Sequence, residues 1–237
     1  MAKKEIKYQG VSTLEVLVEA KNYNKWISHE IQFHLVPPVL EIGAGTGNLT
    51  ASSLKIKPLH VTDKDPGLVK HLKEKYIKEK DVFVWLLDIA KNPPDKFKSF
   101  FSTIFAVNVL EHIKDDKKAL KNIGKMLKKD GELVLLVPAK KFAFTKLDRE
   151  LGHYRRYEKR ELVMKLEKTG YRVEKIYFFN IVGLISWYFR DKVKRENINL
   201  KPYHIAIFDK IVPFLRSIET RIRPPVGISL IVIAKKL

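Results

Sequence analysis

The sequence predicts an α/β fold in which helices flank a doubly wound, mostly parallel sheet. Short apolar runs alternate with amphipathic segments between residues 39 and 138, which is typical of strands joined by crossover helices. A glycine-rich turn follows the first run, and acidic residues follow the next two. We therefore expect one domain over residues 1–237, with a ligand site at the carboxyl ends of the strands.

Residues 1–36 are expected to form two N-terminal helices. The first covers about residues 3–20, and the second opens near Asn22 and ends before Pro37-Pro38. Tyr23 and Trp26 have the spacing of core or packing residues, and a second interpretation is that this helix covers a bound ligand from one side. Proline favours extended backbone at the preceding residue, so the chain should enter the first strand directly.

The first strand and its turn read Val39-Leu40-Glu41-Ile42-Gly43-Ala44-Gly45-Thr46-Gly47-Asn48. Glycine permits positive φ angles and a close approach of a ligand to the backbone. A helix beginning near Asn48 would point its free N–H groups at the same space. The dinucleotide fingerprint requires a glycine where this chain has Asn48. Glu41 would repel a pyrophosphate but attract an ammonium group, which favours S-adenosylmethionine (SAM) over NAD.

The second strand runs from Leu59 to Asp63 and ends in a carboxylate about 20 residues beyond the first glycine. At this spacing Asp63 can accept hydrogen bonds from both ribose hydroxyls, whether the nucleoside belongs to SAM or to NAD. Asp65 precedes Pro66 and is expected to cap a helix over 67–78.

Three further strands are expected, at residues 82–87, 102–108 and 132–138. Asp88 and Ile89 follow the first of them. Asn92-Pro93-Pro94-Asp95 comes next and is interpreted as a turn, because a catalytic motif of this kind would follow the fourth strand and end in an aromatic residue. A helix is expected over about 115–128, and an Asp130-Gly131 turn leads into the fifth strand.

The segment Glu41 to Gly47 resembles motif I of the class I SAM-dependent methyltransferases, and residues 108–138 are very similar to the stretch that follows that family's motif IV. The resemblance is to the broad type-11/type-12 methyltransferases. It implies a Rossmann-like sheet of seven strands with an antiparallel last strand, a SAM-binding core over 37–138, and S-adenosylhomocysteine as the product. It also implies that Asp88 accepts a hydrogen bond from the adenine amino group. The expected cofactor-binding residues are Glu41, Gly43, Ala44, Gly45, Gly47, Asp63, Lys64, Asp88, Ile89, Asn108 and Val109.

Residues 139–227 are expected to form substrate-side elements and a helical cap. Residues 148–157 resemble a D-x-x-x-G-H-Y-R-R-Y feature found in part of this superfamily. From its place after the fifth strand we expect His153, Tyr154, Arg155 and Tyr157 to contact the substrate, and Arg155 and Arg156 to be able to clamp a phosphate or carboxylate. The alternative is that Arg155 and Tyr157 tie a lid loop to the core.

A helix over about 158–169 and a sixth strand over 171–178 should follow, with the last strand at 228–235. Between these strands lies a helical insertion, 179–227. It contains the aromatic run Trp187-Tyr188-Phe189, basic residues at 190–195, and a helix expected over 205–221. The insertion is interpreted either as a cap on the sheet or as an amphipathic element that meets a membrane or an apolar acceptor.

The expected chemistry is a direct displacement at the SAM methyl group, for which the protein mainly aligns the reactants. An oxygen or nitrogen acceptor also needs a base, and His112 and His153 are the candidate catalytic residues. The chain has no cysteine, which excludes a thiol nucleophile. Its seven histidines are scattered without ligand spacing, so no metal site is expected.

The net charge of +19 attracts polyanions, although Lys-rich helices of a thermophile protein explain the same excess. An RNA methyltransferase is therefore an alternative, but no RNA-binding motif is visible, so a nucleic-acid partner is not favoured. A SAM-binding scaffold or regulatory subunit without turnover is another alternative, and a nicotinamide dehydrogenase a distant one. The absence of a signal-like or membrane-spanning segment predicts a cytoplasmic protein with at most peripheral membrane contact. The sequence leaves the acceptor and the oligomeric state open.

Overall fold

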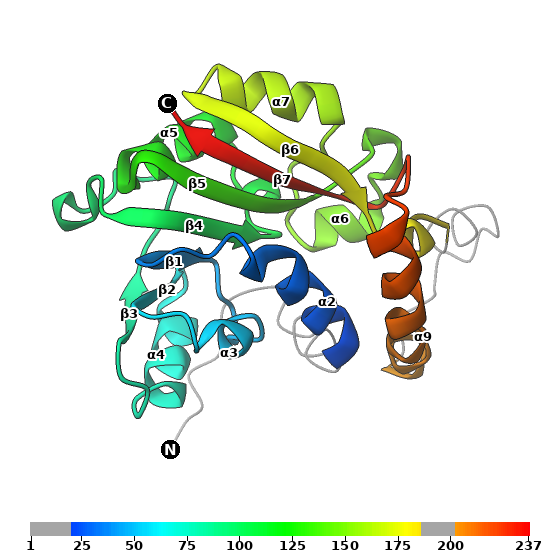
Figure 1. The fold of residues 1–237 in the computed structure, drawn as a ribbon, viewed down its shortest axis with the longest axis horizontal. Coiled ribbons are helices and arrows are strands. Elements are labelled where there is room, and N and C mark those ends of the chain that lie inside the picture. The colour runs from blue at the N-terminus through cyan, green and yellow to red at the C-terminus, as the bar shows by residue number, and fades with distance from the viewer. Residues whose placement is uncertain (1–19, 186–201) are drawn as a thin grey trace.

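The computed structural model describes residues 20–185 and 202–237, which form one seven-stranded sheet in the order β3-β2-β1-β4-β5-β7-β6 (Figure 1). The strands are β1 (Val39–Ile42), β2 (Leu59–Asp63), β3 (Val82–Leu86), β4 (Phe101–Val107), β5 (Leu127–Pro138), β6 (Tyr171–Phe179) and β7 (Ser229–Lys236). The first five pair in parallel, whereas β7 is antiparallel to both of its neighbours. The predicted fold class is confirmed, including the antiparallel last strand.

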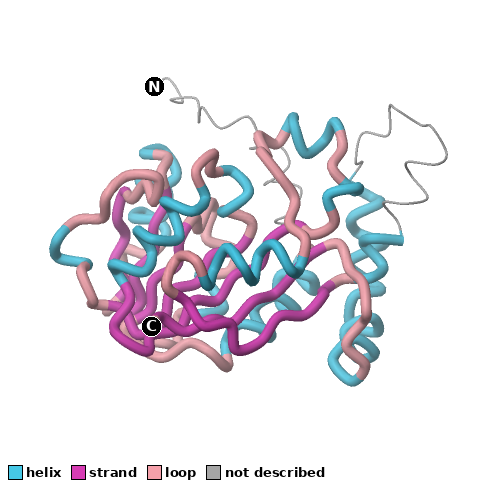
Figure 2. Tube along the Cα trace, turned by 90° about the horizontal axis from the view of Figure 1, so that it is seen from above, coloured by secondary structure: helices cyan, strands magenta, loops and turns pink. Residues whose placement is uncertain are grey.

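Helices cover both sides of this sheet (Figures 1 and 2). The helices are α2 (Lys21–Gln32), α3 (Thr50–Ser53), α4 (Pro66–Lys75), α5 (Asp116–Met126), α6 (Lys146–Glu150), α7 (Lys159–Glu167) and α9 (Pro202–Arg221). Short 3-10 turns occur at η1 (Asp95–Phe97), η2 (Leu110–His112) and η3 (Lys141–Ala143). Of the described helices, none is long and apolar enough to cross a bilayer.

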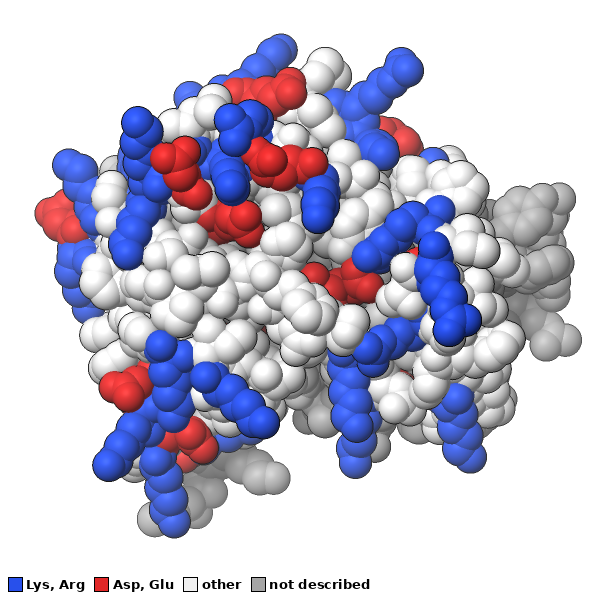
Figure 3. Space-filling model, in the orientation of Figure 1, with Lys and Arg blue, Asp and Glu red and all other residues white. Residues whose placement is uncertain are grey.

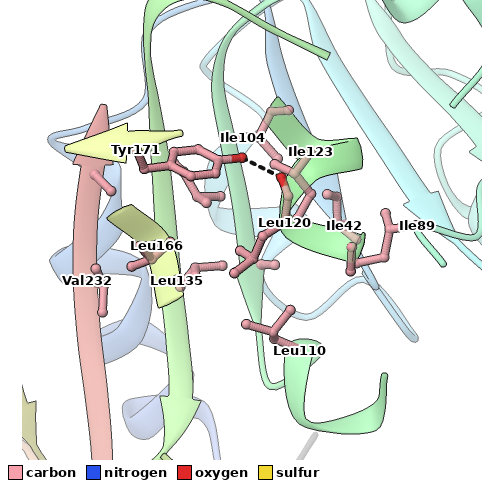
Figure 4. Packing of buried hydrophobic residues seen from close by; sticks show 14 of the residues in the cluster. Ile42, Ile89, Ile104, Leu110, Leu120, Ile123, Leu135, Leu166, Tyr171 and Val232 are labelled. Carbon is pink, nitrogen blue, oxygen red and sulfur yellow. Dashed lines mark hydrogen bonds between the residues drawn. The ribbon is translucent and has the colours of Figure 1, made fainter. Parts of the chain in front are cut away.

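Alternation along the strands divides the core into two layers, because successive side chains of a strand point to opposite faces. Leu133 and Leu135 of β5 join the cluster under α5 and α7, whereas Val134 and Leu136 face the opposite side, which α2, α4 and α9 cover. Figure 4 shows the first layer, in which the Tyr171 hydroxyl donates to the Leu120 carbonyl at 2.8 Å.

Strand order reverses at β1, which lies between β2 and β4. In open α/β sheets, ligands bind in the crevice outside the carboxyl ends of the strands at such a switch point. The glycine turn and Asp63 therefore come to the same edge of the sheet.

Some local expectations differ from the structure. The helix after the glycine turn has only four residues and begins at Thr50 instead of near Asn48. β5 begins at Leu127, and its pairing with β4 jumps from Leu127 to Glu132, so the Asp130-Gly131 turn lies within the strand's bounds. The helix predicted over 3–20 and the aromatic and basic run at 187–195 lie outside the described residues.

Other expectations agree with it. Asp65 caps α4 as predicted, because its Oδ1 accepts from the backbone N–H groups of Gly67 at 2.7 Å and Leu68 at 3.1 Å. The segment Asn92-Pro93-Pro94-Asp95 leads into the turn η1, and the Asn92 side chain accepts from Lys125 Nζ at 3.1 Å. The predicted helix before the last strand is α9.

Candidate functional site

A cleft of about 820 Å³ lies at the carboxyl ends of β1, β2 and β4. Most of the residues expected to hold the cofactor line it: Glu41, Gly43, Ala44, Gly45, Asp63, Lys64, Asp88, Ile89, Asn108 and Val109. Both candidate catalytic histidines, His112 and His153, line it as well. Residues from three strand ends and two later loops thus come together in one cavity large enough for a nucleoside-sized ligand.

The glycine turn forms the floor of the cleft, and the structure shows why glycine is needed there. Gly43 has φ +70°, and a Cβ at this position would lie 2.5 Å from Val109 Cγ2. Gly47, which is also expected to hold the cofactor, does not itself line the cleft. A Cβ on Gly47 would lie 2.7 Å from the hydroxyl of Tyr76, which donates to the Gly47 carbonyl at 2.8 Å. Gly47 is therefore a packing position against α4.

Asp63 is the last residue of β2, and it lines the cleft. One carboxylate oxygen accepts from Gly45 N–H and the other from Asp65 N–H, both at 2.9 Å, and the residue is 8% exposed. Burial raises the pKa of Asp63, while the hydrogen bonds from Asp65 and Gly45 lower it. The side chain is thus fixed by the backbone, with its carboxylate on the cleft wall.

Glu41 is a second acid on the same wall, and it is only 3% exposed. Its Oε2 accepts from the Thr50 hydroxyl at 2.6 Å. Burial raises the pKa of Glu41 to about 7, and the nearby charge of Asp63 adds to this effect. Two acids beside the glycine turn favour a cationic ligand over a phosphate.

The loops after β3 and β4 also line the cleft. Asp88 Oδ1 accepts from Ala90 N–H at 3.0 Å, and the neighbouring Ile89 packs into the core cluster beneath α5. Asn108 has φ +52°, and its N–H donates to the Leu136 carbonyl at 2.9 Å. This part of the cleft therefore offers a carboxylate, from Asp88, next to an apolar side chain, from Ile89.

His112 and His153 lie side by side in the lining of the cleft, with ring centroids 4.6 Å apart in a T-shaped arrangement. Burial lowers the pKa of His112 to about 4, and the charges of His153 and Lys64 lower it further. The Nδ1 atom of His153 lies 2.9 Å from Asp148 Oδ1. The imidazole of His153 therefore has a fixed orientation.

Asp148 is held by several donors from the segment predicted to bind substrate. Arg156 Nε donates to Oδ1 at 2.9 Å and Arg156 Nη2 to Oδ2 at 3.1 Å. Thr145 donates to Oδ2 through its backbone N–H at 2.9 Å and its hydroxyl at 3.1 Å. Burial opposes the ionisation of Asp148, but the hydrogen bonds from His153 and Arg156 outweigh it and hold its pKa below the usual value.

Three of the residues expected to contact substrate lie elsewhere. Tyr157 is 0% exposed, and its hydroxyl donates to Asp116 Oδ2 at 3.0 Å. Arg155 pairs with the same carboxylate at 2.7 Å and donates to the Lys114 carbonyl at 2.7 Å. Tyr154 is 56% exposed and, like Arg155 and Tyr157, does not line the cleft. Arg155 and Tyr157 thus tie the loop to the core, which was the alternative interpretation.

Sequence reasoning missed several residues that line the cleft. Asn24 and Ile27 of α2 line it together with Tyr23, which fits the second interpretation of this helix, that it covers a bound ligand from one side. The i, i+4 spacing of Tyr23 and Ile27 was the available signal for a shared face. Leu151 also lines the cleft, and nothing in its spacing relates it to the glycine turn. Arg156, which the sequence analysis considered as a clamp for a substrate anion, lines the cleft as well.

The expectation of no metal site rests on the spacing of the histidines along the chain, and the fold brings together residues that this spacing does not relate. The structure brings ligand atoms of Glu111, His112 and His153 within 4.8 Å of one another. Glu111 and His112 are neighbours in η2, whereas His153 comes from the loop after α6, some 40 residues further along the chain. Spacing along the chain therefore gave no sign of the cluster.

Comparison with known proteins shows that part of this chain is similar to methyltransferases. Residues 40–133 match the family model described as a methyltransferase domain. Over 106 residues the chain is 31% identical to the highly reducing polyketide synthase verA of Penicillium polonicum. The match covers 41% of this chain and 4% of that protein, so the chain spans only a small part of the length of this curated relative.

Solved structures share the whole fold at low identity. One is a chain from the complex between the Haloferax volcanii Trm112 methyltransferase activator and a methyltransferase: 13% identity, TM-score 0.67, covering 100% of this chain and 99% of that one. Another is the trans-methyltransferase CalH in complex with S-adenosylhomocysteine: 18% identity, TM-score 0.60, covering 94% and 59%. At such identities the similarity establishes the fold.

Proposed function

We propose that this chain is a class I SAM-dependent methyltransferase and that it transfers the methyl group of SAM to an acceptor that enters the cleft beside His112 and His153. The observation that carries this proposal is the position of Asp63. Its buried carboxylate, fixed by two backbone N–H groups, stands at the carboxyl end of β2 on the cleft wall. A carboxylate in this place suits the two hydroxyls of a ribose.

The remaining residues of the cleft fit the rest of SAM. Glu41 and Asp63 make the wall beside the glycine turn acidic, which suits the ammonium group and disfavours a pyrophosphate. We assign Asp88 to the adenine amino group and Ile89 to the adenine ring. At Gly43 a side chain would collide with Val109, so the backbone stays bare where the cofactor would approach.

Bound SAM supplies an electrophilic methyl group on a sulfonium. The protein's task is then to align the acceptor with that methyl group, exclude water, and take a proton where the acceptor carries one. His153 suits proton transfer when no metal is bound, because its Nδ1 is held by Asp148 and its Nε2 is the atom that remains for the acceptor. His112 lies beside it with a lowered pKa, so it is neutral near pH 7.

The acceptor class that we favour is lipid-linked or otherwise apolar. One face of α9 packs on α2 through Phe208, Val212 and Leu215. The opposite face exposes apolar side chains at helical spacing, namely Ile207, Ile211, Phe214, Ile218 and Ile222. Basic Lys210 and Arg221 accompany this stripe. An exposed apolar stripe with basic neighbours is typical of helices that lie at an anionic membrane surface.

The proposal is tested by incubating the protein with tritiated-methyl SAM and fractionated cell material. We expect label in the lipid fraction and little in RNA, protein or small polar molecules. Label in the RNA fraction would instead support the RNA alternative. SAM binding in calorimetry without transfer into any fraction would support a scaffold and contradict the proposed activity.

The charge distribution gives the RNA alternative little support. On the face that Figure 3 shows, Lys and Arg side chains are spread over several separate areas and are interleaved with acidic ones. Nucleic-acid sites usually gather their basic residues into one patch or stripe. The basic residues on this face therefore do not form a nucleic-acid site of that kind.

The raised pKa of Glu41 predicts a pH dependence of SAM binding. Burial raises this pKa to about 7, and an ammonium ligand would favour the ionised form and lower it again. SAM affinity should therefore fall as the pH drops below about 7, by up to about tenfold per pH unit. Calorimetry across pH 6 to 8 measures this. Glu41→Gln should bind SAM more weakly and lose the slope; an equal slope in that variant would contradict the assignment.

A further inference from the structure

Three side chains of the kinds that bind metals converge at the acceptor end of the cleft. Ligand atoms of Glu111, His112 and His153 all lie within 4.8 Å of one another. The two histidines line the cleft, and Glu111 lies behind them, fully buried. The segments that carry these residues are also joined, because the N–H of Tyr154, the residue after His153, donates to the Glu111 carbonyl at 2.8 Å. The cluster is therefore part of the folded framework.

Glu111 lacks the compensation that a buried carboxylate needs. It is 0% exposed, and neither of its carboxylate oxygens hydrogen-bonds to another residue. Leaving such a group without a partner in the interior is costly. The neighbouring cation, Arg156, is turned to Asp148, to which it makes two hydrogen bonds. A positive charge between Glu111 and the two imidazoles would remove this penalty.

The imidazole of His153 is oriented as in many metal sites. Its Nδ1 is held by Asp148, which leaves Nε2 as the atom for a metal. A carboxylate that holds the second nitrogen of a ligating histidine is a recurrent feature of such sites, because it fixes the tautomer and the ring orientation. Asp148 is itself fixed by Arg156 and Thr145. Asp148 is thus a positioning residue.

We propose that Glu111, His112 and His153 form a binding site for one divalent transition-metal ion. Two imidazoles and one carboxylate suit Zn²⁺, Co²⁺, Mn²⁺ or Fe²⁺, and three protein ligands leave coordination positions open. Since the histidines line the cleft, these open positions face the space where the acceptor enters.

The role of the ion rests on the proposed methyltransferase function. An acceptor hydroxyl that coordinates the ion has a lowered pKa and gives up its proton to solvent. Its oxygen lone pair then forms the bond to the methyl carbon, the carbon–sulfur bond breaks, and that electron pair returns to sulfur. Neutral S-adenosylhomocysteine leaves. The ion thereby takes over the proton chemistry that His153 performs in the metal-free protein.

Co²⁺ titration of the full-length, chelator-treated protein tests the site directly. We expect one Co²⁺ per chain, seen as visible absorption bands that added Zn²⁺ abolishes. Glu111→Gln and His153→Ala should each weaken Co²⁺ binding at least about tenfold, and Asp148→Asn should do so through the orientation of His153. His71→Ala is the matched control, since His71 is an exposed histidine of α4. This control should bind Co²⁺ like the wild type.

Two outcomes would overturn the inference: no Co²⁺ binding by the wild type, or unchanged binding in both Glu111→Gln and His153→Ala. Thermal melting identifies any variant that fails to fold, and His153→Gln then replaces His153→Ala. SAM binding is measured on the same samples with and without chelator. If the protein binds SAM but not Co²⁺, only the proposal of a metal site is contradicted. If the protein binds Co²⁺ but not SAM, the proposed methyltransferase function is contradicted and the metal site is still supported.

Discussion

Asp63→Ala is expected to weaken SAM binding about 100-fold or more and to remove most of the thermal stabilisation that SAM confers. A hydrogen bond to a charged group contributes about 1.5 kcal/mol or more, and a ribose would offer two of them to this carboxylate. Losing about 3 kcal/mol corresponds to about a hundredfold in Kd. Asp63 also holds Gly45 N–H at 2.9 Å, so its loss loosens the glycine turn and adds to the effect. Calorimetry with SAM and with S-adenosylhomocysteine measures it.

Asp65→Ala is the matched control for this experiment. Asp65 lies two residues away and caps α4, with its side chain directed to Gly67 and Leu68. We expect this variant to lose about 1 kcal/mol of stability while keeping SAM affinity close to that of the wild type. If Asp63→Ala binds SAM as tightly as the wild type, the ribose assignment is wrong. If both variants lose binding equally, the effect belongs to the loop and not to the carboxylate.

Asp116→Ala is expected to lower the free energy of unfolding by about 3–5 kcal/mol, because it strands buried charge. Asp116 is the first residue of α5, and its carboxylate pairs with Lys165 of α7 and with Arg155 and accepts from the Tyr157 hydroxyl. Lys165 is only 9% exposed, so without this partner it has little access to water. Urea unfolding followed by circular dichroism measures the loss.

Asp115→Ala is the control, because Asp115 only caps α5 by accepting from Lys118 N–H at 3.0 Å. It should cost about 1 kcal/mol. Asp116→Ala combined with Lys165→Met should recover much of the loss, since no charge is then stranded on α7. A loss in Asp116→Ala no larger than in the cap control would contradict the network's importance.

The sign of the pH dependence provides a further check on Asp116. Burial opposes ionisation of Asp116, but Lys165 and Arg155 outweigh it and hold its pKa below the ordinary value of 3.8. A carboxyl whose pKa is depressed by folding stabilises the protein above its unfolded pKa and loses that contribution as the pH falls below it. The stability difference between wild type and Asp116→Ala should therefore be constant above about pH 5 and shrink in acid.

Much of the fold could be predicted because its signals are local. An apolar run followed by glycine predicts a strand and a tight turn, and the structure has β1 and the positive φ angles of Gly43 and Gly45 there. Asp65 before Pro66 predicts a helix start, and Asp65 caps α4. The order of these elements also predicted that Glu41, Asp63, Asp88 and Asn108 would meet, because the carboxyl ends of parallel strands lie along one edge.

Prediction was weaker where a side chain's partner lies far away in the sequence. Tyr157 and Arg155 have the residue types of a substrate site, yet both are directed to Asp116, 41 residues from Tyr157 in the sequence. Gly47 looks like part of the ligand turn, and it packs against Tyr76, the residue that follows α4. Residue type alone does not distinguish a group that faces a ligand from one that closes a loop onto the core.

The sequence by itself determined the order of strands and helices, the glycine turn and the acids that mark the cofactor end of the cleft, since spacing of two, three or four residues encodes these features. Only the tertiary structure decided what stands at the acceptor end. In the folded chain, residues of α2 line the cleft and Asp148 contacts His153. The buried carboxylate of Glu111 lies beside the imidazoles of His112 and His153. Glu111 and His112 lie some 40 residues before His153 in the sequence, and proximity between segments that far apart arises only when the chain packs.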